Sequence, residues 1–125
     1  MNTNHSHRPS PGHQPPGDPS LARVVLVTHP AEGAQEFAQA IVGARLAACV
    51  NLLPATSVYR WEGVVEAAEE VLLVIKTSSA RMDDLRAHVL SAHPYDCPEF
   101  LGLTPGDLEG RYLTWLLAAS SEEQE

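Results

Sequence analysis

The 125 residues allow one ordinary domain, and 44% hydrophobic with 19% charged residues is typical of a packed soluble domain. The 8 Lys and Arg residues against 16 Asp and Glu residues give a formal charge of -8, and Lys76 is the single lysine. Binders of DNA, RNA or anionic lipid need clustered cations, whereas these arginines are scattered among acids. We therefore expect no nucleic acid and no membrane as partner, while metal ions and cationic small molecules remain permitted.

Cysteine usage and the N-terminal composition bear on the compartment. Cys49 and Cys97 are too few for a disulfide framework and form no C-x-x-C pair, so we interpret them as reduced thiols. The N-terminus is polar and proline-rich where a secretory signal needs an apolar run of about 7–15 residues, and no apolar stretch approaches the roughly 18 residues of a membrane span. The sequence predicts a cytoplasmic protein.

Both ends of the chain differ in composition from its centre. Residues 1–20 hold five of the ten prolines and three of the six histidines, and no aliphatic residue follows Met1 there. Such a segment cannot bury enough apolar area to offset the entropy of ordering, so it is predicted to be a disordered tail. The acidic end, residues 120–125, is predicted to fray. The folded domain should span residues 21–119.

A strand and a helix are predicted to open the domain. The β-branched run Ala22–Thr28 predicts a buried strand, which His29-Pro30 ends because proline stops regular pairing. Between residues 31 and 46 apolar side chains recur at a spacing of three and four, which predicts a helix. Its apolar stripe consists of Ala34, Phe37, Ala38, Ile41 and Val42.

The central part of the sequence predicts a long two-stranded ribbon. Residues 47–61 form one strand kinked at Pro54, and Glu62-Gly63 stands where a hairpin turn would fall because glycine accepts positive φ. Residues 64–77 return as the second strand. A ribbon that outruns its own domain exposes backbone edge and side chains, which something must cover.

The last elements complete a known plan. Ser78 or Ser79 can cap a second helix, which carries Met82, Leu85 and Val89 and ends at His93-Pro94. Residues 98–103 predict a short strand, and residues 108–119 a closing amphipathic helix. The order βαββαβ plus a helix predicts an α+β ferredoxin-like sandwich, in which a four-stranded antiparallel sheet carries two helices on one face.

Three stretches together resemble the CutA family of divalent-cation tolerance proteins. They are RLAACVNLLP at 45–54, SVYRWEG at 57–63 continuing to EVLLVIKT at 70–77, and HPYDCPE at 93–99. The resemblance covers residues 22 to 118. It implies a non-enzymatic protein involved in the response to metal ions, whose protomers form a tight homotrimer with each long hairpin reaching onto its neighbours. The architecture also resembles the trimeric PII signalling proteins, which bind effectors between subunits.

Aromatic residues on the predicted ribbon suit such an interface. Tyr59 and Trp61 alternate on one face of the strand, as large amphipathic anchors. The acids expected to rim the tip are Glu62, Glu66, Glu69 and Glu70. An alternative is that the two aromatic side chains belong to the core of their own chain.

The motif His93-x-x-x-Cys97-x-Glu99 brings imidazole, thiol and carboxylate within seven residues. Cys97 and Glu99 would share a face of an extended segment, and the bend at Pro94 could turn His93 toward them. A thiolate with an imidazole suits copper or zinc, and Glu99 could be a third ligand. The alternative is a small buried cysteine beside a histidine that a backbone carbonyl satisfies.

The resemblance implies a different ligand set for copper. Copper-binding members look as if they combine a cysteine late in the first strand with two adjacent histidines at the end of the second helix. Val27 and Ala92 occupy two of these positions here, and only His93 fits. Cys97 could substitute, and His29 could approach from the end of the first strand.

Catalysis and effector binding complete the alternatives. Asp96 and Glu99 beside Cys97 would raise the pKa of its thiol, and no phosphate loop, nucleophile elbow or H-E-x-x-H helix is present, so we expect no enzyme. A small polar effector could instead bind in a cleft between subunits. The side chains offered for it are Arg60, Trp61, Lys76 and Tyr95, with His93 and Glu99 nearby. A Lys76–Glu99 ion pair, or a purely structural scaffold trimer, are the alternatives.

Overall fold

The computed structural model describes residues 16–122. Its elements in chain order are a 3₁₀ turn Pro19–Leu21, β1 Ala22–Pro30, α1 Ala34–Gly43, β2 Cys49–Trp61, β3 Val64–Ser78, a 3₁₀ turn Ser79–Arg81, α2 Met82–Ala92, β4 Leu101–Leu103 and α3 Gly110–Ala119. This is the predicted order of strands and helices.

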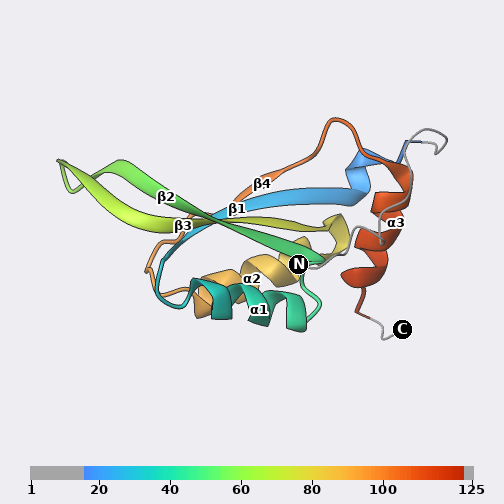
Figure 1. The fold of residues 1–125 in the computed structure, drawn as a ribbon, viewed down its shortest axis with the longest axis horizontal. Coiled ribbons are helices and arrows are strands. Elements are labelled where there is room, and N and C mark those ends of the chain that lie inside the picture. Colours follow the sequence, from blue (N-terminus) through green and yellow to red (C-terminus); the bar gives the residue numbers. More distant parts are fainter. Residues whose placement is uncertain (1–15, 123–125) are drawn as a thin grey trace.

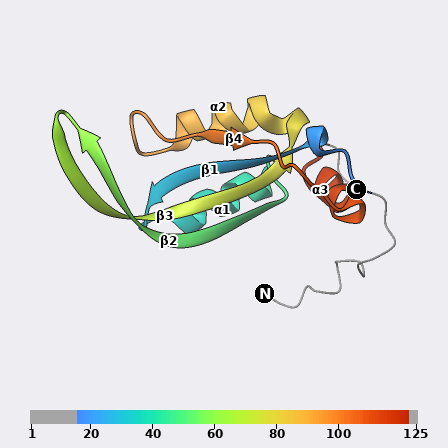
Figure 2. The same cartoon turned by 90° about the horizontal axis from the view of Figure 1, so that it is seen from above.

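The four strands form one antiparallel sheet in the order β2-β3-β1-β4. Helices α1 and α2 lie side by side on one face of this sheet, and α3 lies beyond the end of the sheet that is opposite the hairpin (Figures 1 and 2). The arrangement confirms the ferredoxin-like α+β fold.

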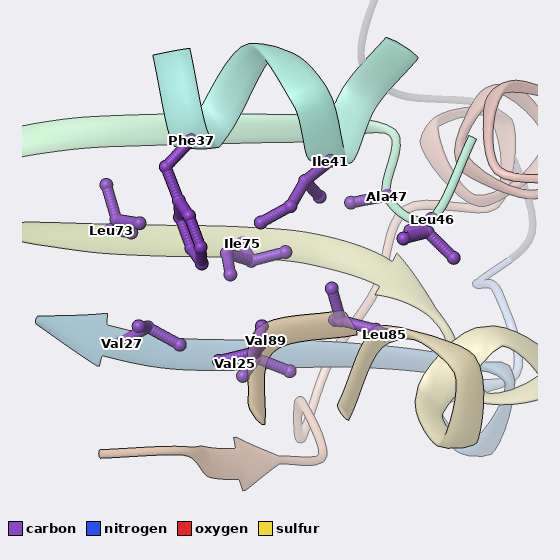
Figure 3. Packing of buried hydrophobic residues seen from close by; sticks show 10 residues of the cluster. All are labelled: Val25, Val27, Phe37, Ile41, Leu46, Ala47, Leu73, Ile75, Leu85 and Val89. Atoms are coloured by element: carbon purple, nitrogen blue, oxygen red, sulfur yellow. The ribbon is translucent and has the colours of Figure 1, made fainter. Parts of the chain in front are cut away.

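The core fills the space between the sheet and the two helices. Alternate residues of β1 and β3 point into it, and α1 and α2 close it from the other side (Figure 3). The members with no exposed surface include Val25, Val27, Ile41, Leu73, Ile75, Leu85 and Val89. Val42 does not belong to the buried stripe of α1 as predicted, because its side chain faces outward and is 39% exposed.

The β2–β3 hairpin is longer than the rest of the sheet. Pairing between β1 and β3 ends at Pro30 opposite Glu70, whereas β2 and β3 continue together as far as Trp61 opposite Val64. The extension of β3 from Glu70 to Val64 spans about 20 Å at 3.3 Å per residue. Both turn residues, Glu62 and Gly63, have positive φ, at 51° and 81°. Figure 1 shows this arm projecting past α1 and α2.

The start of α2 differs from the prediction. Neither Ser78 nor Ser79 caps the helix: Ser78 makes no capping hydrogen bond with its side chain, and a 3₁₀ turn leads into α2. Arg81 holds this turn instead. Its buried guanidinium donates to the carbonyl of Arg45 at 3.1 Å and to the carboxylates of Asp84 and Glu122 at 2.8 Å each.

Both predicted ends of the domain need correction where the structure describes them. The predicted disorder does not extend to residues 16–20, because the Gly17 N–H donates to the carbonyl of Leu108 at 2.7 Å. The predicted fraying does not reach Ser120, which is fully buried, or Ser121, whose carbonyl accepts from Arg45 Nε at 2.6 Å. The remaining residues of both predictions, 1–15 and 123–125, lie outside the described chain.

One face of the sheet is left uncovered by α1 and α2, and we call it the open face. Residues paired in register share a face, so the pairs Val24–Leu103 and Leu26–Leu101 belong together. The pairs of β3 with its neighbours extend the set, whose apolar members are Val24, Leu26, Leu53, Leu72, Val74, Leu101 and Leu103. Leu101 and Leu103 are 54% and 51% exposed.

Candidate functional site

The His93 ring is fixed between two backbone groups where α2 ends. Its Nε2 lies 2.7 Å from the carbonyl of Thr28 on β1, and its Nδ1 lies 3.0 Å from the N–H of Tyr95. Because a backbone N–H can only donate, Nδ1 accepts, and Nε2–H donates to Thr28. The ring is therefore neutral and has both nitrogens engaged.

Burial reinforces the neutral state of His93. The side chain is 7% exposed, and desolvation lowers its pKa below the ordinary value of 6.5. The hydrogen bond to Thr28 acts in the opposite direction, while the nearby His29 ring lowers the pKa further.

Tyr95 and Glu70 form the polar part of the same site. The Tyr95 hydroxyl donates to Glu70 Oε2 at 2.6 Å, and burial together with this bond raises the pKa of Tyr95 to about 12. Glu70 is 8% exposed and lies inside this network, so the prediction that it rims the hairpin tip is wrong. The pKa of Glu99 is also raised, by burial first and by the charge of Glu70 second.

Aromatic rings pack behind this network. Ring centroids of His29 and His93 lie 4.9 Å apart, and the Phe37 ring lies 4.8 Å from His29 and 5.5 Å from His93. The alternation of Val25, Val27 and His29 along β1 is the sequence signal that places His29 on the core face. No local signal identified Glu70, because the partner of its hydrogen bond, Tyr95, lies 25 positions later in the chain.

The three residues of the predicted metal set are not assembled within one protomer. Among residues 16–122, no group of three or more His, Cys, Asp or Glu side chains could hold a metal ion. His93 lacks a free nitrogen, and the Cys97 thiol is exposed. At the positions that the family resemblance assigned to copper ligands, Val27 is fully buried in the core and Ala92 is exposed.

The residues predicted to line an effector cleft lie far apart in one protomer. Arg60 and Trp61 stand at the hairpin tip, and Tyr59 and Trp61 are 45% and 57% exposed, so they are not part of their own chain's core. Lys76 pairs with Val24 on β1, and 12 residues of extended β3, about 40 Å, separate it from the tip. Tyr95 lies between these ends, beside Glu70.

Lys76 has a neutral partner in its own chain. Its ammonium group donates to the side-chain carbonyl of Asn51 on the neighbouring strand. In the described part of the chain no carboxylate pairs with Lys76, since the ion pairs found there join Arg81 to Asp84 and Glu122. The alternative of a Lys76–Glu99 ion pair within the protomer is therefore wrong.

Across residues 16–122, no helix is both long enough and apolar enough to cross a membrane.

The fold and site define a ferredoxin-like α+β protein with an overlong central hairpin and a histidine–tyrosine–glutamate network beside the sheet. The family model described as CutA1 divalent ion tolerance protein matches residues 23–119, and the chain belongs to this family. It is similar to the divalent-cation tolerance protein CutA of Thermus thermophilus, with 43% identity over 98 residues that cover 77% of this chain and 95% of the relative.

Solved structures show the same fold. CutA from Synechococcus elongatus is 40% identical with a TM-score of 0.79, covering 82% of this chain and 92% of that one. A structure titled PII-like protein CutA from Nostoc is 29% identical with a TM-score of 0.76, covering 81% and 99%. The family resemblance and the likeness to PII-type folds expected from the sequence are thus confirmed.

Proposed function

We propose that this protein acts as a non-enzymatic, cytoplasmic homotrimer in divalent-cation tolerance, with the hairpin of each protomer packed on its neighbours. The observation that carries the trimer is the hairpin arm. Beyond Glu70, no strand of the described residues lies beside the arm, whose own two strands pair only with each other, and both of its faces carry exposed apolar side chains among polar ones. Its exposed side chains include Val58, Tyr59, Trp61, Val64 and Val65. Such an apolar surface on a soluble chain suits a protein interface.

The trimer is tested by light scattering on the full chain. Wild type should have the mass of three protomers, and Trp61→Gln should shift the population toward monomer because it removes a large apolar anchor. Leu90→Gln is the matched control, since Leu90 is a 47% exposed apolar residue on α2, away from the hairpin. A monomeric wild type, or equal dissociation of both variants, would contradict the proposal.

The relatives are named divalent-cation tolerance proteins, which points to a metal ion as ligand. The candidate site has two groups that can bind a metal ion, a thiol and a carboxylate. Cys97 is exposed and Glu99 lies two residues further on, so a metal ion could bind there with ligands from a second protomer. A zinc or copper titration of the full chain by calorimetry tests this, with His5, His7 and His13 replaced by Gln to remove nonspecific binding. Saturation at one ion per protomer that Cys97→Ser abolishes supports a metal site.

A second candidate is a PII-like role in binding a small effector between protomers. The partly buried polar network of Glu70, Tyr95 and Glu99 favours it, because polar groups held at fixed positions suit recognition of a small polar ligand. Absence of metal saturation in the titration above, followed by saturable binding of a metabolite that Tyr95→Phe weakens, would favour this candidate. If the protein binds neither a metal ion nor a metabolite, a structural scaffold trimer is the remaining candidate.

A further inference from the structure

The chain after α1 turns at Arg45, in a backbone conformation that favours glycine. Arg45 has a φ of 61°, and its N–H donates to the carbonyl of Val42 at 2.9 Å. The N–H of Leu46 donates to the carbonyl of Ile41 at 3.0 Å. These two bonds form the Schellman motif that ends many helices, whose left-handed residue is usually glycine. The backbone is therefore strained at Arg45, and such strain persists where other contacts of the residue hold it in place.

The Arg45 side chain supplies these contacts at the end of another helix, α3. Its Nε donates to the carbonyl of Ser121 and its Nη2 to the carbonyl of Ala118, at 2.6 Å each. The last carbonyls of a helix have no partner within the helix, and they carry a partial negative charge that a cation stabilises. Arg45 thus ends α1 with its backbone and α3 with its guanidinium.

Arg81 reinforces this connection from the start of α2. Its buried guanidinium donates to the backbone carbonyl of Arg45 at 3.1 Å and to the carboxylate of Glu122, which follows α3, at 2.8 Å. The two arginines therefore join the end of α1, the start of α2 and the end of α3. We call Arg45 and Arg81 the arginine clasp.

Apart from the clasp, α3 packs through a small apolar cluster of its own. Leu113 and Leu116 of α3 are buried with Ala22 at the start of β1, and this cluster is separate from the main core that α1 and α2 cover. Figure 2 shows α3 beyond the end of the sheet. Segments with few buried apolar contacts open locally at a lower free energy than the core does.

The N-terminal segment 16–21, which we call the strap, packs on the start of α3 and the loop before it. The Gly17 N–H donates to the carbonyl of Leu108 at 2.7 Å. A Cβ added at Gly17 would lie 3.0 Å from Leu113 Cδ2, so glycine permits a close approach of the strap to α3. If α3 moved away, the strap would lose this support.

We propose that α3 and the strap form one unit that opens while the main core stays folded, and that the arginine clasp keeps this unit closed. Opening exposes the side chains of Ala22, Leu113 and Leu116 and releases both ends of the described chain. Every contact of the clasp and the strap lies within one protomer. The inference therefore goes beyond the proposed homotrimer and does not rest on it.

Hydrogen–deuterium exchange of the full chain, followed by mass spectrometry, tests the opening unit. In wild type, the amides of α3 and the strap should exchange faster than those of β1 and β3. Arg45→Gly removes the guanidinium, while glycine suits the left-handed backbone that ends α1. In this variant α3 and the strap should exchange faster by on the order of tenfold or more, because hydrogen bonds to a charged donor are lost. Exchange in α1 and in the β2–β3 hairpin should not accelerate.

Two further arginine variants control this comparison. Arg111→Ala removes an exposed arginine from the first turn of α3, outside the clasp, and should leave exchange unchanged. Arg45→Lys keeps the charge and the strained backbone but lacks the planar fork that donates to two carbonyls. Its α3 should exchange at a rate between those of wild type and Arg45→Gly.

Gly17→Ala tests from the other side whether the strap and α3 are one unit. The added methyl group meets Leu113 and should displace the strap. If the two segments open together, exchange should accelerate in α3 as well as in the strap, and β1 and β3 should stay unchanged. Acceleration confined to the strap would overturn the single unit.

The remaining outcomes also decide the inference. A wild-type α3 that exchanges as slowly as β3 overturns the opening unit. Unchanged α3 exchange in Arg45→Gly overturns the role of the clasp, and so does equal acceleration in every element, because the arginine would then contribute only to global stability. None of these outcomes bears on the homotrimer, which light scattering tests separately.

Discussion

At the scale of single residues, the His93 ring shows how the backbone can decide the chemistry of a side chain. Its two nitrogens serve Thr28 and Tyr95, so the ring ties the segment after α2 to β1. The same bonds remove the free nitrogen that a metal ligand needs. His93, four residues before Cys97 in the sequence, is thus a structural residue in this protomer.

The first prediction concerns the pH dependence of stability. The folded pKa of His93 lies below 6.5, so as the pH falls the unfolded chain takes up a proton first. The stability is fully present above pH 6.5 and is lost toward the lowered folded pKa, at no more than about 1.4 kcal/mol per pH unit. Denaturant unfolding of wild type and His93→Gln from pH 7.5 downward should show this slope in wild type and a shallower slope in the variant. Equal slopes would contradict the assignment.

Tyr95 supports a second prediction. Tyr95→Phe leaves the buried Glu70 carboxylate without its hydroxyl donor, which should lower the free energy of unfolding by about 1–3 kcal/mol. In an ultraviolet absorbance titration of the phenol, the component that the variant loses should titrate at about pH 12. If that component titrates near pH 10 instead, the hydrogen bond to Glu70 is not formed in solution.

At the scale of elements, the hairpin combines strong local pairing with weak support from the rest of the chain. Pro54 lies inside β2 without breaking its pairing to Val71, because β2 is an edge strand with its outer side unpaired. The turn at Glu62-Gly63 has positive φ at both residues, as two-residue hairpins prefer. Glutamate is unfavourable in this left-handed backbone conformation, so replacing Glu62 tests the turn directly.

Glu62→Asn should stabilise the protein. Asparagine tolerates the left-handed region better than glutamate, so we expect a gain of about 0.5–1 kcal/mol in the free energy of unfolding. Gly63→Ala is the matched opposite: its new Cβ meets no atom within 4 Å, and the loss of about 1 kcal/mol comes from the backbone conformation alone. Chemical denaturation at a fixed protein concentration measures both, and a neutral Gly63→Ala would show that the turn is not formed as described.

At the scale of the whole molecule, one protomer leaves large apolar side chains exposed outside its core. The hairpin arm and the open face lie on different parts of the chain, and both carry exposed valine, leucine or aromatic side chains. If neighbours cover them, folding and assembly become one equilibrium.

Coupled folding and assembly make thermal stability depend on concentration. A tenfold increase in protein concentration should raise the Tm by about 2–6 °C, because mass action favours the folded trimer over unfolded monomers. Differential scanning calorimetry over two decades of concentration checks this expectation. A Tm that does not move would mean that the protomer melts independently of its neighbours.

The sequence alone determined the order of elements, the hairpin turn and the fold class, because local periodicity and turn residues act over a few positions. It placed Phe37 and Ile41 in the core and Tyr59 and Trp61 on the hairpin. The motif letters from His93 to Glu99 predicted a metal site, which stays a prediction. Which chemistry that site has did not follow from the letters.

Tertiary structure decided the state of those groups, since it depends on contacts between residues distant in sequence. Thr28 accepts a hydrogen bond from His93 across 65 positions, Tyr95 donates one to Glu70 across 25, and Arg45 donates one to the carbonyl of Ser121 across 76. Lys76 and Arg60, which the sequence offered for one cleft between subunits, stand at opposite ends of the β2–β3 ribbon within a protomer. A pattern of letters records which groups are available, and only the folded chain sets the distances and burial that give each group its charge and its partner.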